Sequence, residues 1–258
     1  MNRALELFAC YGSFEPQSSE YNICKAVVEC FDEIETMSAA QMAARAFTSE
    51  PTIRRFCRKL GYDSFAEFKK ALIVDYHEIK TITSVVLRMH NNAADSIFDL
   101  LNKSIQTLIK VQELFTEERL NKLRVLVAQS DRVRIYSAAP LGYVPLLTAI
   151  LHSRGIDVES PLFIHHQRED IVKLNDGSLV FLLGDPRFFN SAFGEQIELA
   201  YKKGVKFCLC LNEEHSLFTK YASVDFSVDM YRPCGFLAYE YLLGAIMRAY
   251  VYDLELAE

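Results

Sequence analysis

Two short helical patterns joined by a three-residue turn place the strongest constraint on the fold of this chain. Residues 37–61 read MSAAQMAAR, then AFT, then SEPTIRRFCRKLG. Ser49 suits a helix N-cap, Pro51 is tolerated in a first turn, and Gly61 suits a helix C-terminus. The second pattern carries apolar residues at i, i+3, i+4 and i+7, which predicts one buried face: Ile53, Phe56, Cys57 and Leu60.

Positive charge gathers on the outward side of the second predicted helix. On a helical wheel Arg55 and Arg58 point away from the apolar face, and Arg54 and Lys59 flank it. A charge run alone usually marks a solvated surface, but two capped helices with a tight turn favour a DNA-reading helix-turn-helix. The residues predicted to contact DNA are Ser49, Thr52, Arg54, Arg55, Arg58 and Lys59.

Residues 37–70 resemble the N-terminal domain of the RpiR/MurR family of bacterial transcriptional regulators. The family pattern is Ser-x-x-Thr-x-x-Arg-Phe-x-x-x-Leu-Gly, followed after a short loop by two aromatic residues three apart. The matching residues here are Ser49, Thr52, Arg55, Phe56, Leu60, Gly61, Phe65 and Phe68. The resemblance implies an oligomeric regulator of carbohydrate metabolism genes, with a C-terminal sugar isomerase (SIS) domain that senses a metabolite.

The net charge of −6 does not exclude DNA, because charge is distributed unevenly. Residues 6–35 hold seven acidic side chains and one basic one, whereas residues 45–70 hold seven basic and three acidic ones. An acidic remainder suppresses non-specific attraction to phosphate and leaves a local basic patch effective. With half of its 258 residues hydrophobic, the chain is expected to fold as one large or two small domains.

The seven cysteines are an odd number without a repeated CxxC spacing, and they are interpreted as reduced thiols of a cytoplasmic protein. No secretion signal and no transmembrane helix are expected, because no 18-residue apolar run occurs. Cys208 and Cys210 share one face of a predicted strand, and burial explains them better than a metal site. Neither a metal, a cofactor nor a nucleotide-hydrolysing loop is predicted.

The periodicity changes along the chain and predicts two domains with a helical connector. Residues 1–80 are predicted as the all-α helix-turn-helix domain, and residues 81–128 as an apolar connector packed on the C-terminal domain or a second subunit. Residues 129–258 are predicted as an SIS-like α/β domain with a parallel sheet of about five strands. Strands are expected at 133–136, around 158, and at 179–183, 205–211 and 226–228, with helices at 143–153, 190–203, 215–221 and 233–256.

A ligand of such a sheet would bind beyond the carboxyl ends of the strands, near helix N-termini. The candidate loops are 137–142 and 184–190, with a third edge at 212–216. The candidate ligand residues are Ser137, Gly142, Asp185, Arg187 and Asn190.

Both loops depart from the phosphate-binding turns of the SIS family, Gly-x-Gly-x-Ser and Ser-x-Ser-Gly-x-Thr. In the first loop Leu141 takes the place of serine, and in the second Asp185 and Arg187 take the places of two serines. A carboxylate there would repel phosphate, so a sugar-phosphate effector is doubtful. Two interpretations stay open: the pocket contacts a second subunit or binds a ligand without phosphate, or Arg187 and Asn190 hold an anion.

An isomerase would need a base beside the phosphate cradle. The candidates are Glu195, the helix-end His152, and His165-His166, whose rings are expected to point apart in an exposed loop. The altered cradle and the DNA-binding domain argue against catalysis. The prediction is a non-enzymatic regulator that binds a two-fold operator as a homodimer or tetramer. The alternative is an SIS-type sugar phosphate isomerase or a non-catalytic sugar-phosphate-binding module.

Overall fold

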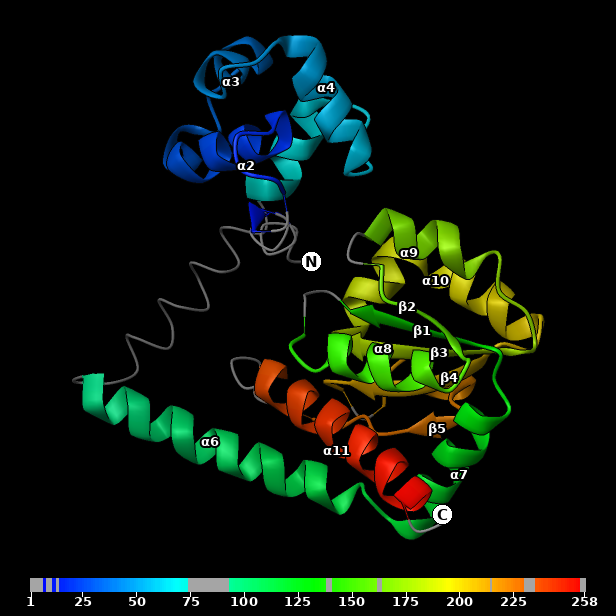
Figure 1. The fold of residues 1–258 in the computed structure, drawn as a ribbon. Helices are drawn as coiled ribbons and strands as arrows, with labels where there is room; N and C mark the ends of the chain where they lie inside the picture. The colour runs from blue at the N-terminus through cyan, green and yellow to red at the C-terminus, as the bar shows by residue number, and fades with distance from the viewer. Residues whose placement is uncertain are drawn as a thin grey trace. The chain divides into compact units, whose positions relative to one another are not determined.

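The computed structural model describes residues 7, 11–12, 14–73, 93–137, 141–161, 164–213, 215–229 and 235–255. The chain divides into two compact units, residues 1–90 and 91–258 (Figure 1). The first is helical and the second is an α/β domain with a five-stranded parallel sheet, which confirms the predicted fold class.

The first unit is built from short helices with well-defined N-caps. Helix α2 spans Ser19–Glu29, η1 Phe31–Glu33, α3 Ala39–Arg45 and α4 Glu50–Lys59, and a further helical stretch covers residues 65–73. Ser18 caps α2, and Ser38 forms a reciprocal capping box with Gln41 at the start of α3. These caps satisfy backbone N–H groups that short helices would otherwise leave without partners.

An aromatic cluster fixes α4 against the stretch 65–73. The rings of Phe56 and Phe68 meet edge to face with centroids 6.0 Å apart, and Tyr62 lies 5.3 Å from Phe68. Phe65 is buried on the same side, 6.3 Å from Phe68. The aromatic residues of the sequence pattern therefore hold the outward face of α4 in a fixed orientation.

Phe47 occupies a strained position in the turn between α3 and α4. Its φ of +51° lies in the left-handed region, which costs a bulky residue roughly 1–2 kcal/mol, and its side chain is 93% exposed. We expect Phe47→Gly to raise the free energy of unfolding by about 0.5–1 kcal/mol, because the strain exceeds the extra chain entropy of glycine. Urea unfolding would measure this; a destabilised variant would show that the ring makes a stabilising contact.

The second unit carries an all-parallel sheet in the order β2-β1-β3-β4-β5. Its strands are β1 Arg132–Ser137, β2 Asp157–Glu159, β3 Ser178–Gly184, β4 Lys206–Leu211 and β5 Val224–Asp225. Its helices are α6 Ala93–Glu113, α7 Glu117–Ala128, α8 Val144–Ser153, α9 Ile164–Ile171, α10 Pro186–Lys202 and α11 Gly235–Glu255. Helices α9 and α10 cover one face, and α7, α8 and α11 cover the other (Figure 1).

The connector helices belong to the second unit. Val111 of α6 and Leu123 and Val127 of α7 are buried in the same core as the strands and α11. Packing on the C-terminal domain is one of the two placements that their apolar character allowed. Their burial accounts for only part of the apolar character of residues 93–128, because Ile97, Leu101 and Ile105 of α6 are exposed.

Three element predictions need correction. Residues 215–221 do not form an α-helix; within the described part only the 3₁₀ turn η2, Thr219–Tyr221, is present. The last strand ends at Asp225, although Phe226 and Val228 still donate backbone hydrogen bonds to Leu209 and Leu211. Helix α9 was missed, because its buried face contains the polar Gln167 between Ile164 and Ile171 and so weakens the apolar period.

Candidate DNA interface and effector site

The outer face of α4 presents its cations to solvent. Ile53, Phe56 and Cys57 are buried, as the wheel requires, and the exposed residues are Arg54, Arg55, Arg58 and Lys59. Burial also raises the pKa of the Cys57 thiol to about 12, so this cysteine is an unreactive core residue. The helix therefore separates an apolar face that fixes it from a basic face that can meet a polyanion.

The first turn of α4 contains a small hydroxyl network. Ser49 occupies the N-cap position, but its hydroxyl lies 2.9 Å from the Thr52 hydroxyl and makes no capping hydrogen bond. Arg55 in turn donates to Thr52 Oγ1 at 3.3 Å. The expected capping role of the Ser49 side chain is therefore wrong; the hydroxyl pair instead orients Arg55 along the exposed face.

Lys59 serves the fold of the first unit. Its ammonium donates to Glu20 Oε1 of α2 at 3.2 Å and lies 5.4 Å from the centroid of the Phe14 ring. This contact helps lower the pKa of Glu20, after the larger effect of that residue's own backbone hydrogen bond. Arg54 forms a longer contact of 3.8 Å with Glu50. Arg55 and Arg58 are therefore the strongest candidates for DNA contact.

A hollow of about 390 Å³ adjoins the basic face. It lies between the N-terminus of α3, the flank of α4 and the start of the stretch 65–73, and Arg54, Arg58 and Lys69 line it together with Asp63. The two arginines favour a phosphate group, whereas the amides of Ser38 and Gln41 at the start of α3 already bind each other's side chains.

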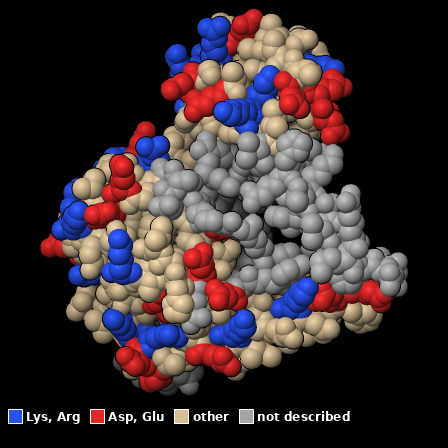
Figure 2. All heavy atoms as spheres, turned by 180° about the vertical axis from the view of Figure 1, so that it is seen from behind, with Lys and Arg blue, Asp and Glu red and all other residues tan. Residues whose placement is uncertain are grey.

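Charge elsewhere is mixed in sign. On the face drawn in Figure 2, basic and acidic side chains are interspersed over both units, and no broad surface of one sign is visible. The described side chains on this face therefore form no extended basic surface.

The amide groups at the start of α8 are already bound by a carboxylate of the same chain. Glu240 of α11 accepts hydrogen bonds from the backbone N–H of Gly142 and, at 2.9 Å, from that of Tyr143. The Tyr143 ring packs on Gly244, where a Cβ would come within 3.1 Å of it. Helix α11 thus places a negative charge at the helix N-terminus where the predicted first loop would receive an anion.

The second predicted loop is almost absent, because β3 ends at Gly184 and α10 begins at Pro186. Only Asp185 connects them, and the expectation of a loop over residues 184–190 is wrong. Burial, and then the charge of Asp185, raise the pKa of Tyr239, which is buried on α11. Tyr239 and Glu240 therefore bring α11 toward both loops. The side chains of Arg187 and Asn190 lie outside the described residues.

Sequence reasoning missed Glu240 because it lies almost 100 residues from Gly142. The available signal was indirect: a carboxylate near the start of the last helix, in a fold that brings this helix to the carboxyl ends of the strands.

Ser137 is buried at the end of β1, and its carbonyl accepts a hydrogen bond from Gln167 at 3.0 Å.

The candidate bases are distributed over three helices. Glu195 is exposed on α10 just after a kink at Phe193, and His152 lies in the last turn of α8. His165 and His166 are on α9, with ring centroids 4.1 Å apart, so the expectations of a loop and of diverging rings are both wrong. Cys208 and Cys210 are fully buried on β4, as predicted.

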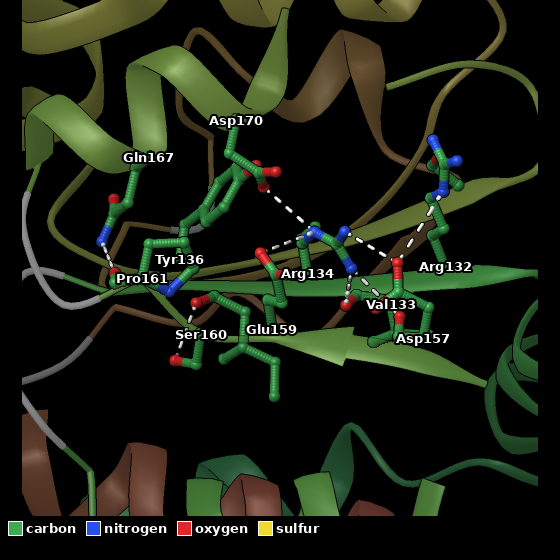
Figure 3. Close-up of polar contacts among 12 residues, drawn as sticks. Arg132, Val133, Arg134, Tyr136, Asp157, Glu159, Ser160, Pro161, Gln167 and Asp170 are labelled. Atoms are coloured by element: carbon green, nitrogen blue, oxygen red, sulfur yellow. Dashed lines mark hydrogen bonds and ion pairs between the residues drawn. The ribbon is translucent and has the colours of Figure 1, made fainter. Parts of the chain in front are cut away.

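A polar cluster lies between β1, β2 and α9 (Figure 3). Arg134, whose side chain is 6% exposed, donates to Asp170 Oδ2 at 3.1 Å and to Asp157 Oδ2 at 3.0 Å. Tyr136 donates to the same Asp170 oxygen at 2.6 Å. A hollow of about 420 Å³ beside the cluster is lined by charged groups of both signs: Glu159, Glu169, Asp170 and Lys173, with His166 beside them.

None of the helices in the described ranges is long and apolar enough to cross a membrane. Over the same ranges, no group of three or more histidine, cysteine, aspartate or glutamate side chains is arranged to hold a metal ion.

Comparisons with known proteins place the first unit in a family. Residues 13–78 match the helix-turn-helix domain of the rpiR family, which confirms the family that residues 37–70 resemble. An uncharacterised HTH-type transcriptional regulator of Caldanaerobacter subterraneus is 25% identical over 170 residues, or 66% of this chain and 60% of the relative. One from Clostridium perfringens is 26% identical over 46% of this chain and 44% of the relative. The matches thus span less than two thirds of either relative.

Two solved structures show weaker similarity. The Vibrio vulnificus NanR protein complexed with ManNAc-6P is 18% identical, with a TM-score of 0.46, covering 96% of this chain and 92% of that one. The sugar isomerase domain of an RpiR transcription factor from Sphaerobacter thermophilus is 14% identical, with a TM-score of 0.42, covering 61% and 97%. Similarity at this level does not transfer a ligand.

Proposed function

We propose that this protein, whose first unit is an rpiR-family helix-turn-helix domain, is a DNA-binding transcriptional regulator that acts in the cytoplasm. The observation that carries the proposal is the outer face of α4, where Arg55 and Arg58 are exposed beside a hollow suited to phosphate. Carbohydrate metabolism genes are proposed as targets on the family resemblance alone. Two copies would read a two-fold operator, because one helix supplies too few contacts for specific binding.

The test is binding to DNA from the promoter region of the protein's own locus, measured by fluorescence anisotropy at two salt concentrations. We expect specific retention over an unrelated duplex, with affinity that falls as salt rises. Equal affinity for both duplexes at every salt concentration would contradict a regulator that reads sequence.

We propose that an effector of the second unit places no anionic group at the start of α8. The Glu240 carboxylate accepts hydrogen bonds from the backbone N–H groups of Gly142 and Tyr143, which would otherwise be available to a phosphate. A sugar phosphate bound in the usual way would have to displace a carboxylate of the chain itself. This supports the interpretation that the pocket binds a ligand without phosphate or contacts a second subunit.

Removing the Glu240 carboxylate should open this position. We expect Glu240→Ala to lower the free energy of unfolding by about 1–2 kcal/mol, since charge-assisted hydrogen bonds to the helix N-terminus are removed. Inorganic phosphate should then raise the Tm of the variant more than that of the wild-type protein. The exposed Glu195→Ala serves as the control for loss of one negative charge. An equal phosphate response in all three proteins would show that Glu240 does not occupy an anion site.

We also propose that the protein is not an enzyme. Glu195 is exposed on α10, whereas His152 lies in the last turn of α8 and the two adjacent histidines are on α9. None of the predicted bases therefore comes from the loops after β1 and β3. Turnover of a hexose or pentose phosphate by the full-length protein, abolished by Glu195→Ala, would favour the isomerase alternative.

A further inference from the structure

Helix α3 ends in a Schellman motif that carries Phe47 at its left-handed residue, just before α4. The Phe47 N–H donates to the Ala44 carbonyl at 3.3 Å, and the Thr48 N–H donates to the Ala43 carbonyl at 2.9 Å. This pair of hydrogen bonds requires a positive φ at the residue after the C-cap Ala46, and φ is +51° at Phe47. Glycine is the usual residue there, because a Cβ is crowded in this conformation.

Three other helices end in the same motif with glycine at the equivalent position. Gly61 follows α4, Gly155 follows α8 and Gly204 follows α10, with φ values of +82°, +79° and +89°. In each motif the glycine N–H donates to the carbonyl three residues back, and the next N–H donates to the carbonyl five residues before it. Among the described helix ends with this pair of hydrogen bonds, only that of α3 has a side chain at the left-handed residue.

The Phe47 side chain gains no burial that would offset this strain. It is 93% exposed, the highest exposed fraction among the large hydrophobic residues that the structure describes. Met42 and Ala46 are buried, so the end of α3 is held in the unit without the phenylalanine ring. Residues kept in strained backbone conformations cluster at binding sites and active sites. The strained and exposed ring therefore points to a binding contact.

We propose that Phe47 contacts DNA, with its ring packed on an apolar part of the duplex beside the base edges that α4 reads. The proposal rests on the proposed DNA-binding function and adds a contact to it. Phe47 precedes Ser49, the N-cap of α4, by two residues, so their Cα atoms lie no more than about 7.6 Å apart. The N-terminal residues of a recognition helix are those that approach base edges in the major groove.

The residues that follow Phe47 form a polar row on the exposed side of α4. Ser49 is exposed, and its hydroxyl lies 2.9 Å from that of Thr52, which accepts a hydrogen bond from Arg55. Such groups suit phosphate oxygens and base edges, whereas the ring adds an apolar group before the start of the row. DNA offers two apolar surfaces to such a ring, the thymine methyl group in the major groove and the deoxyribose.

The test is the affinity for DNA from the promoter region of the protein's own locus, measured by fluorescence anisotropy with the full-length chain at several salt concentrations. We expect Phe47→Gly and Phe47→Asn each to weaken binding ~10-fold, which corresponds to burial of most of one phenylalanine side chain. The salt slope should stay the same, because neither variant removes a charge. Asparagine tolerates the left-handed conformation and is less flexible than glycine, so agreement between the two variants excludes an effect of a loosened turn.

Stability separates a contact with DNA from a role in the fold. Phe47→Gly should bind DNA more weakly although its backbone strain is relieved, and Phe47→Tyr should bind like the wild-type protein because it keeps the ring. The matched control is Gln17→Gly, because Gln17 is the other described non-glycine residue with a positive φ, +69°, and it is exposed as well. This control should gain stability without a change in affinity.

Unchanged affinity in Phe47→Asn would overturn the proposal, even if Phe47→Gly bound more weakly. A Phe47→Tyr variant as weak as Phe47→Asn would do the same. A Phe47→Asn variant that unfolds more readily than the wild-type protein would assign the ring to a contact within the chain, and would also overturn the proposal.

An unrelated duplex separates the two apolar surfaces of DNA. A loss on the promoter duplex alone would assign the ring to a base edge, whereas an equal loss on both duplexes would assign it to the deoxyribose, and either supports the contact. Failure of the DNA-binding proposal is distinguishable, because the wild-type protein itself would then show no preference for the promoter duplex. Wild-type protein that binds the promoter duplex specifically, with variants of Phe47 that bind it equally well, would overturn only the contact of Phe47.

Discussion

Arg55→Ala/Arg58→Ala is expected to weaken specific DNA binding by roughly 10²-fold or more while leaving the fold intact. Each arginine that contacts a base edge contributes about 1–3 kcal/mol of discrimination, and removing an arginine from a phosphate lowers the salt slope by about one unit. Both side chains are exposed, so their removal opens no cavity. Anisotropy at several salt concentrations would measure both the affinity and the slope.

The control must remove the same charge elsewhere. Arg154→Ala/Arg168→Ala takes two exposed arginines from the second unit and changes the net charge equally. If attraction to DNA depended only on net charge, the two double variants would lose affinity alike. A loss confined to the α4 variant would assign binding to the recognition helix, whereas an undiminished α4 variant would contradict the proposed DNA interface.

The elements that sequence predicted well are those whose signals are local. The α4 face follows from four apolar residues within two turns, and Ile53, Phe56, Cys57 and Leu60 are all buried. Strands β1, β3 and β4 are short β-rich runs between helical patterns, and the parallel sheet follows from that alternation. In each case the pattern lies within one element or between neighbours in the sequence.

The missed features depend on contacts between distant residues. Nothing near Gly142 indicates that Glu240 binds its amide, because only the folded sheet brings α11 to that loop. The loop expected over residues 184–190 was inferred from a family motif, although Pro186 can begin a helix. Lys59 shows the same limit: its place on the wheel suggests DNA, but its partner Glu20 comes from another helix. Site residues were therefore less predictable than the elements that carry them.

Arg134→Met is expected to lower the free energy of unfolding of the second unit by about 3–5 kcal/mol, the typical cost of removing one partner from a buried ion pair. Arg134 donates to Asp157 and Asp170 and to the backbone carbonyls of Val133 and Asp157. Burial alone would lower its pKa, but these partners raise the pKa above its ordinary value. Without Arg134, the Asp170 carboxylate, which is only 14% exposed, would lose the cation that lies 3.1 Å from it.

Arg132→Met provides the matched comparison, because Arg132 lies on the same strand and contacts the same Asp157. Its distance to Asp157 is 3.8 Å and its side chain is 45% exposed, so we expect a loss of about 0–1 kcal/mol. Adding Asp170→Asn to Arg134→Met should restore part of the stability, since the stranded charge is then removed. Urea unfolding followed by circular dichroism would measure all three variants. Equal losses of stability in the Arg132→Met and Arg134→Met variants would show that burial of the Arg134 guanidinium contributes nothing. The cluster in Figure 3 would then stabilise the unit only through its exposed carboxylates.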